Sequence, residues 1–203
     1  MPAPAIPFVS GGDATGSYSV YLRNSSILTL VSSSSAGSSR RTIEAQILKA
    51  AFPSDPADPR FQTVNGLERL AAGIAQNAND TYPAGQSITN YGSPSAYAVA
   101  VVNGDCTLGP GTGFGLLLVR GQLTISGTYS WSGLIVVIGQ GMVHWNADAF
   151  GSIDGGLFVA RTRDVFGSLL AAPVGITYTQ SDTATIARAN AAFPYIPIAI
   201  REY

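Results

Sequence analysis

Short apolar runs, most of them ending at glycine, recur along the middle of the chain. Three runs rich in Val, Ile and Leu cover residues 98–104, 115–121 and 133–139, and a weaker fourth covers residues 156–162. Their starting positions are separated by 17, 18 and 23 residues. Runs this short and this rich in β-branched residues predict buried strands rather than helices.

Repetition at about 20 residues is typical of architectures in which similar turns stack on one another. Between the runs, residues 123–127 and 142–145 alternate apolar and polar positions, which predicts a second, shorter strand in each turn. No single turn can bury its own apolar side, whereas stacked turns share a continuous core. We therefore predict a parallel β-solenoid, or β-helix, of three to four turns over residues 95–165.

The N-terminal part of the chain has the pattern of an antiparallel β meander, predicted over residues 18–52. Alternating positions indicate three strands, at residues 18–22, 27–31 and 40–48. A sheet of this kind buries one face and leaves the other in water. The Ser-rich segment 32–39 is interpreted as a flexible loop, and residues 1–17, with three prolines, as an extended lead or linker.

Residues 53–94 are predicted to hold a proline-rich linker and then a helix. Asn65, with Glu68 three residues later, has the pattern of a capping box at a helix start. The apolar stripe of this helix is formed by Leu67, Leu70, Ala71 and Ile74. We expect the helix to cover the open first turn, because the ends of a solenoid otherwise expose core and unpaired backbone. Residues 82–94 are interpreted as an irregular lead-in.

After the solenoid, residues 166–203 are predicted to form a strand–helix–strand cap. Residues 181–183 set up a helix start, with Ile186 and Ala189 facing inward, and the last strand is expected at a sheet edge. The predicted fold class is therefore mainly β: a short parallel β-solenoid with an antiparallel β meander and two short capping helices.

Composition limits the partners and the compartment. Charged residues make up 11% of the chain and the net charge is −1, so no attraction to nucleic acid is expected. Cys106 is the only cysteine, which excludes an intrachain disulfide and argues against a cysteine metal site. The sequence has no run of 18 apolar residues, so no membrane-spanning segment is predicted. The start lacks the pattern of a signal peptide, so we interpret the chain as a fragment whose export segment is absent.

Few residues suggest catalysis. His144 is the only histidine, so no second histidine can complete a metal site. The glycines within residues 111–115 lack the spacing of a dinucleotide-binding motif, and no metal or other cofactor is expected.

Carboxylates are the main alternative, because parallel β-helices often carry polysaccharide lyases and hydrolases. Glycoside hydrolysis needs two carboxyl groups roughly 5 to 9.5 Å apart. The candidates are Asp105, Asp148, Asp154 and Asp164. Asp105 and Asp154 adjoin glycine, as turn residues do, and no two acids occupy matching repeat positions, which favours structural roles. A calcium site at Asp148 and Asp154 is a further alternative with few ligands, since calcium takes about six to eight oxygens.

A candidate ligand or partner surface follows from aromatic residues with polar neighbours. Its members are His144, Trp145, Asn146, Asp148, Asp154 and Trp131. For Trp131, packing inside a turn is favoured over exposure. For Trp145 the two interpretations are balanced, because the residues around it are polar.

The repeat residues also carry a resemblance. Residues 113–127 and 129–141, with their glycine–aromatic–apolar turns, resemble the C-terminal region of bacterial PilX-family pilus-assembly proteins, which are minor-pilin-like. The likeness extends over most of residues 18–203. The apolar N-terminal assembly helix of that family is not in this sequence, so the chain is interpreted as a truncated soluble portion.

The resemblance implies a non-enzymatic, extracytoplasmic structural or adhesion module of a type IV pilus-associated surface protein. Its partners would be other pilus or cell-surface proteins, or itself, with glycans as an alternative. The pattern leaves two other functions open. One is a carbohydrate-active β-helix enzyme, either a polysaccharide lyase or a hydrolase, and the other is a sugar-binding module without turnover.

Overall fold

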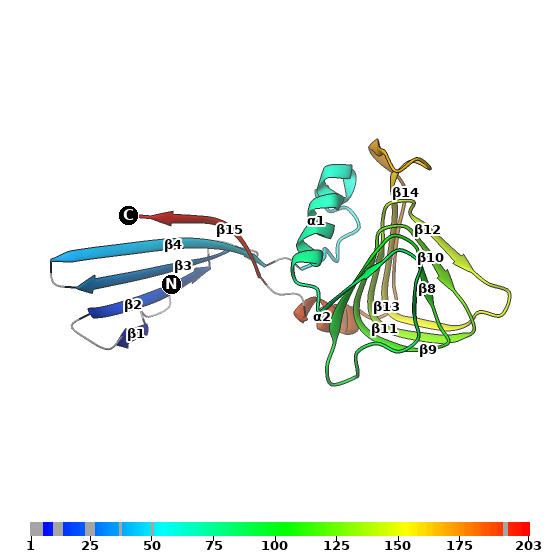
Figure 1. The fold of residues 1–203 in the computed structure, drawn as a ribbon, viewed down its shortest axis with the longest axis horizontal. Helices are drawn as coiled ribbons and strands as arrows, with labels where there is room; N and C mark the ends of the chain where they lie inside the picture. Colours follow the sequence, from blue (N-terminus) through cyan, green and yellow to red (C-terminus); the bar gives the residue numbers. More distant parts are fainter. Residues whose placement is uncertain (1–5, 10–13, 23–26, 37, 50, 193–194) are drawn as a thin grey trace. The chain divides into compact units, whose positions relative to one another are not determined.

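The computed structural model describes residues 6–9, 14–22, 27–36, 38–49, 51–192 and 195–203. The chain forms two compact units, one made of Met1–Ala50 with Tyr195–Tyr203 and the other of Ala51–Pro194. Figure 1 shows an antiparallel sheet in the first unit and a solenoid with α-helices in the second.

The first unit is a five-stranded antiparallel sheet in the order β1-β2-β3-β4-β15. Its strands are β1 (Ile6–Val9), β2 (Ala14–Leu22), β3 (Ile27–Ala36), β4 (Ser39–Lys49) and β15 (Tyr195–Glu202). The predicted meander is confirmed, but the flexible loop at 32–39 is wrong, because β3 and β4 pair as far as Ala36 and Ser39. The hydroxyl groups of Ser33 and Thr42 form a hydrogen bond of 3.2 Å across this pair of strands. Polar cross-strand pairs of this kind stabilise the sheet.

Both ends of the chain contribute strands to this sheet, which differs from the predicted boundaries. Within the predicted lead, β1 pairs with the start of β2, while residues 1–5 and 10–13 lie outside the described residues. Pro7 is tolerated in β1 because an edge strand needs only half of its backbone donors. The last strand does lie at a sheet edge, but β15 pairs with β4 of the meander rather than with the solenoid.

The second unit is a β-solenoid of about four turns, as predicted. A six-stranded sheet has the order β14-β13-β11-β9-β7-β5, and a four-stranded sheet has the order β12-β10-β8-β6. The six strands are β5 (Asp80–Pro83), β7 (Ala98–Asn103), β9 (Gly111–Val119), β11 (Thr128–Val137), β13 (Phe150–Arg163) and β14 (Leu169–Gln180). The four are β6 (Gln86–Ile88), β8 (Cys106–Leu108), β10 (Gln122–Ile125) and β12 (Met142–Trp145). All pairs are parallel except β13 with β14.

The solenoid begins earlier than the apolar runs suggest. β5 and β6 pair in parallel with β7 and β8, so the first turn lies at residues 80–88, where an irregular lead-in was expected. These two strands are largely polar because one side of each has no neighbouring turn. The fourth repeat also starts one residue earlier than predicted, because Gly155 rather than Gly156 pairs with Gly133.

A column of stacked glycines runs across β9, β11 and β13. Gly115, Gly133 and Gly155 pair with one another and have φ values of +131°, +143° and +130°. A Cβ atom on Gly133 would lie 2.0 Å from the carbonyl oxygen of Gly115. Glycine is therefore required here both for its backbone conformation and for the close stacking of the turns.

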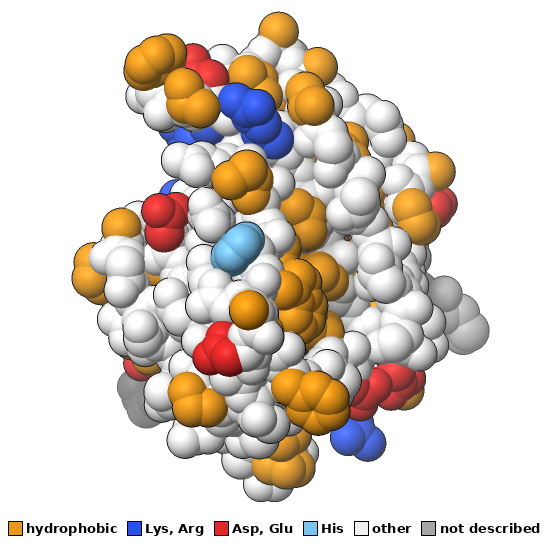
Figure 2. Space-filling view, turned by 90° about the vertical axis from the view of Figure 1, so that its right-hand side faces the viewer, with side chains coloured by type: hydrophobic (Ala, Val, Ile, Leu, Met, Phe, Trp, Pro, Cys, Tyr) orange, Lys and Arg blue, Asp and Glu red, His pale blue; other side chains and the backbone are white. Residues whose placement is uncertain are grey.

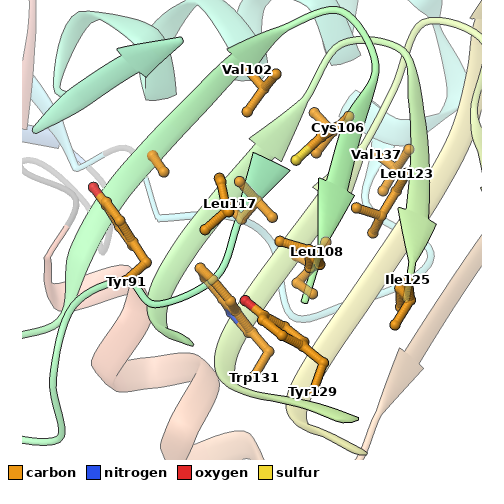
Figure 3. Packing of buried hydrophobic residues seen from close by; sticks show 14 residues of the cluster. Tyr91, Val102, Cys106, Leu108, Leu117, Leu123, Ile125, Tyr129, Trp131 and Val137 are labelled. Atoms are coloured by element: carbon orange, nitrogen blue, oxygen red, sulfur yellow. The ribbon is translucent and has the colours of Figure 1, made fainter. Parts of the chain in front are cut away.

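The interior of the solenoid is filled by side chains from both sheets, as Figure 3 shows for its labelled residues. The Trp131 ring stacks between the rings of Tyr91 and Tyr129, with centroids 6.3 Å and 6.4 Å away. Its indole Nε1 donates a hydrogen bond to the carbonyl of Gly115 at 3.1 Å. Cys106 packs in the same interior, where burial raises the pKa of its thiol to about 12 and keeps it protonated.

The six-stranded sheet is buried on its outer face as well, which explains why its strands read as continuous apolar runs. The helices over it are the 3₁₀ helix η1 (Pro59–Gln62), α1 (Val64–Gln76) and α2 (Thr183–Ala191). Contacts of α1 run to β7, β9 and β14, and contacts of α2 run to β9, β11 and β13. Phe61 packs its ring 4.5 Å from that of Phe158 on β13. Thus α1 covers a face of several turns, whereas we expected it over the first turn.

Both α-helices begin at side-chain caps. Thr63 is the N-cap of α1, its hydroxyl accepting the N–H of Gly66 at 3.0 Å, so the predicted cap at Asn65 is wrong by two residues. The helix ends at its C-cap, Asn77. In α2, Ile186 and Ala189 are buried as predicted.

Asp182, the N-cap of α2, is expected to stabilise the folded protein at neutral pH and to lose this stabilising effect on acidification. Its carboxylate accepts the Thr185 hydroxyl at 2.6 Å and the N–H of Ala184 at 2.9 Å, and these bonds hold its pKa below the usual value. A carboxyl group with a lowered folded pKa stabilises the protein above its unfolded pKa, about 4, and loses this contribution as pH falls through the folded value.

The test is the difference in urea midpoint between the unmodified chain and Asp182→Asn. We expect the unmodified chain to have the higher midpoint near neutral pH, and the difference to close as the pH falls below 4 and the Asp182 carboxylate becomes protonated in the folded protein as well. A difference that stays constant across this range would contradict the assignment.

Candidate functional site

The candidate catalytic carboxylates are engaged in the turns of the solenoid. Asp105 accepts the backbone N–H of Gln122 at 2.8 Å. Asp164 accepts the N–H groups of Phe166 and Ser168, both at 2.9 Å, and so closes the hairpin between β13 and β14. These bonds fit the structural role that the sequence favours for these acids.

The other two acids lie on the surface near the last turn. Asp148 is exposed, and its Oδ2 accepts the Ser126 hydroxyl at 3.4 Å. Asp154 is exposed on β13, opposite Ser132. Within the described part of the chain, no group of three or more His, Cys, Asp or Glu side chains is arranged to hold a metal ion.

Trp131 does not belong to a surface, although the sequence placed it among the candidates. Its side chain is 1% exposed, because it points into the solenoid on β11. It lies opposite Gly113, and a Cβ atom at Gly113 would come within 2.0 Å of the indole ring. The interior position that the sequence favoured for Trp131 is therefore confirmed.

His144 and Trp145 lie on β12, the outermost strand of the four-stranded sheet, and face opposite sides of it. His144 is exposed and continues the outer polar positions of Thr107 and Thr124. Trp145 is aligned with Ile125, an interior residue, yet it is 47% exposed because no further turn covers it in the described part of the chain. Asn146 follows and donates its backbone N–H to the carbonyl of Ile125 at 2.9 Å.

Beside Trp145 the last turn is open and forms a cavity of about 200 Å³, here named the open-turn groove. Its lining residues are Trp145, Ile153, Gly155, Leu157, Thr179 and Ser181. Figure 2 shows hydrophobic side chains gathered in a hollow of this face, beside the chain's one histidine in pale blue.

The groove presents mostly apolar surface, and the Ser181 hydroxyl in its wall is already bonded. The Ser181 hydroxyl accepts the N–H of Gly155 at 2.8 Å and lies 3.2 Å from the carbonyl of Ile153. Ile153 and Leu157 are half-buried and pack against the solenoid core from its open end. The groove is therefore the uncovered end of the core, bordered by an indole ring.

The sequence found part of this site. It singled out Trp145 and its neighbours His144, Asn146 and Asp148, and these do lie together at the last turn. It did not find Ile153, Leu157, Thr179 and Ser181. A signal for the first two exists in the repeat: Ile153 aligns with Trp131 and Leu157 with Ile135, but among the described residues no further strand of the four-stranded sheet follows them.

Comparisons with protein-family models, with curated proteins and with solved structures found no match to this chain. Among the described residues, no helix combines the length and the apolar character that crossing a membrane would require.

Proposed function

We propose that this chain is a non-enzymatic structural module of an extracytoplasmic surface assembly and that it binds a partner protein through the open-turn groove. The observation that carries this proposal is the half-exposed Trp145 at the end of an uncovered core. Exposed apolar hollows rimmed by polar residues are typical of protein interaction sites.

The chemistry around the groove supports binding rather than turnover. Among the residues that the structure describes, no charged side chain lines the groove. The acids of the solenoid turns bond to backbone or hydroxyl groups, as Asp105, Asp164 and Asp148 do. Apolar surface with an aromatic residue is instead what the central part of a protein interface offers.

The setting of the module is proposed from the resemblance described above. A pilus-associated protein at a bacterial cell surface would present such a module to other surface proteins. The low content of charged residues, 11%, means that partners would be recognised by shape and apolar contact rather than by electrostatic steering.

A sugar-binding function is the second candidate, and one observation favours it. The indole of Trp145 is 47% exposed, and an exposed aromatic face can hold a sugar ring.

The first test asks whether the groove accepts apolar surface. The dye ANS fluoresces when it binds exposed hydrophobic sites. We expect the full chain to enhance its emission and Trp145→Ser to reduce that enhancement by at least about twofold, because the groove loses its largest apolar wall. Phe166→Ser is the matched control, since Phe166 is 90% exposed on the β13–β14 hairpin and lies outside the groove. Equal losses in the two variants would overturn the assignment of the groove.

The second test separates the functions. The full chain is incubated with a panel of polysaccharides and applied to a glycan array. We expect neither release of reducing ends or unsaturated products nor retention of a glycan. Release that disappears in Asp148→Asn or Asp154→Asn would establish an enzyme, and glycan retention that disappears in Trp145→Ala would establish a sugar-binding module.

A further inference from the structure

We propose that the open-turn groove takes an extended segment of a partner protein as one additional strand, paired in parallel with β12. This inference rests on the proposed function and adds to it the chemistry of the partner: a short β-strand with alternating apolar and polar side chains. Recognition of this kind combines backbone hydrogen bonds with pockets for alternate side chains.

The first argument is that the last turn is only half built. The six-stranded sheet contains five parallel strands: β5, β7, β9, β11 and β13. The other sheet contains only four: β6, β8, β10 and β12. After β13 the chain reverses into the antiparallel β14 instead of adding a fifth short strand. The position that would follow β12 is therefore empty among the described residues, while its counterpart in the neighbouring sheet is filled.

The second argument is a series of backbone hydrogen bonds that stops at β12. The carbonyl of Ile88 accepts the N–H of Gly109, that of Leu108 accepts the N–H of Ser126, and that of Ile125 accepts the N–H of Asn146, each at 2.9 Å. Trp145 is the next residue in this column, aligned with Ile125. No described strand lies beyond β12 to donate to it, so its carbonyl is the natural acceptor for an added strand.

The third argument is the exposure of interior positions on the same strand. Ile88, Leu108 and Ile125 are at most 4% exposed, whereas Trp145 in the same column is 47% exposed. An added strand would place its apolar residues over Trp145 and against Leu157, and its polar residues in water beyond His144. The apolar–polar alternation of the partner follows from this geometry.

The fourth argument is a contrast between two edges. β14, at the end of the six-stranded sheet, contains Pro173 and pairs with β13 through register shifts, features that discourage further pairing. β12 has the sequence Met-Val-His-Trp, without proline, lysine or a carboxylate. Because β14 closes one sheet and leaves the other open, the site suits a single strand better than the end of a second solenoid.

The probe for the test is a fluorescein-labelled peptide with the sequence of residues 120–127, Arg-Gly-Gln-Leu-Thr-Ile-Ser-Gly. This segment contains β10, which already pairs in parallel with both neighbouring short strands. Binding to the full chain is followed by fluorescence anisotropy. We expect saturable binding, lost when the peptide Leu and Ile are both replaced by Asp.

Two backbone-methylated peptides distinguish strand pairing from unspecific apolar contact. N-methylation of the peptide serine removes the donor that would reach the Trp145 carbonyl, and we expect it to weaken binding about tenfold, since a bond is lost and a methyl group obstructs the edge. N-methylation of the preceding isoleucine is the matched control, because that N–H points away from β12, and we expect no change.

Absence of binding, or binding that both methylations weaken equally, would overturn strand addition. In that case an ANS response that depends on Trp145 would still support the groove as a binding site, so the two proposals fail separately. A concentration-dependent dimer of the full chain, seen by sedimentation and dissociated by the peptide, would assign the groove to a second copy and overturn the partner strand.

Discussion

Gly133→Ala is expected to lower the free energy of unfolding of the solenoid unit by about 3–5 kcal/mol. The φ of Gly133 is +143°, a conformation that L residues rarely adopt, and its Cβ would lie 2.0 Å from the carbonyl oxygen of Gly115. Relief of this contact requires two stacked turns to separate, which would also disturb the apolar layers on either side.

Gly175→Ala is the matched control. Gly175 also has a positive φ, +65°, but nothing lies within 4 Å of the position of its Cβ. We expect a loss of only about 1 kcal/mol, from backbone strain alone. Both variants are measured by urea unfolding followed through tryptophan emission, which reports on the second unit because both tryptophans lie in it. Equal losses would contradict the close stacking of the glycine column.

Trp131→Ala is expected to destabilise the same unit by about 3–5 kcal/mol, because it leaves a large cavity in a close-packed interior. The indole lies between the rings of Tyr91 and Tyr129, and its Nε1–H is bonded to the Gly115 carbonyl. The side chain is 1% exposed, so water cannot compensate for the lost contacts.

Trp145→Ala removes the only other tryptophan and is the natural comparison. Because Trp145 is 47% exposed, its loss should cost less than about 1 kcal/mol. Far-UV circular dichroism during urea unfolding measures both variants independently of tryptophan emission. Trp145→Ala should also leave a single emission band at short wavelength, from the buried Trp131. A larger loss from Trp145→Ala than from Trp131→Ala would contradict the orientation of both residues.

The repeated apolar runs were sufficient to predict the solenoid because each run is buried on both faces. Residues such as Leu117 face the interior, and their neighbours Leu116 and Leu118 are also fully buried. A strand that meets water on neither side carries a strong hydrophobic signal. The short strands of the other sheet alternate between apolar and polar residues, because one of their faces meets water. This alternation is the pattern from which β10 was predicted.

The same reasoning explains the errors. β5 and β6 belong to the first turn, have few apolar residues and were interpreted as irregular. The serine-rich end of β3 is held by backbone pairing with β4, which composition does not reveal. Helix α1 was predicted to within two residues at its start, but its apolar stripe does not specify which of several apolar surfaces it covers.

For the candidate site, the sequence identified the aromatic residue and the structure supplied its surroundings. Trp131 and Trp145 each have a polar residue on both sides in the sequence, and both lie at interior positions of their strands. The strand of Trp131, β11, has another strand stacked beyond it, whereas β12, which carries Trp145, is the outermost described strand of its sheet. That difference makes one of them a core residue and the other the wall of a groove.

The sequence by itself determined the layers: periodic apolar runs with glycine at the corners specify parallel turns around a shared dry interior, because the pattern within each turn is local. Only the tertiary structure decided where the stack ends, which side chains remain uncovered there, and that the two ends of the chain join one sheet. These features depend on which segments meet across long separations in the sequence, and no local pattern of residues encodes an absent neighbour.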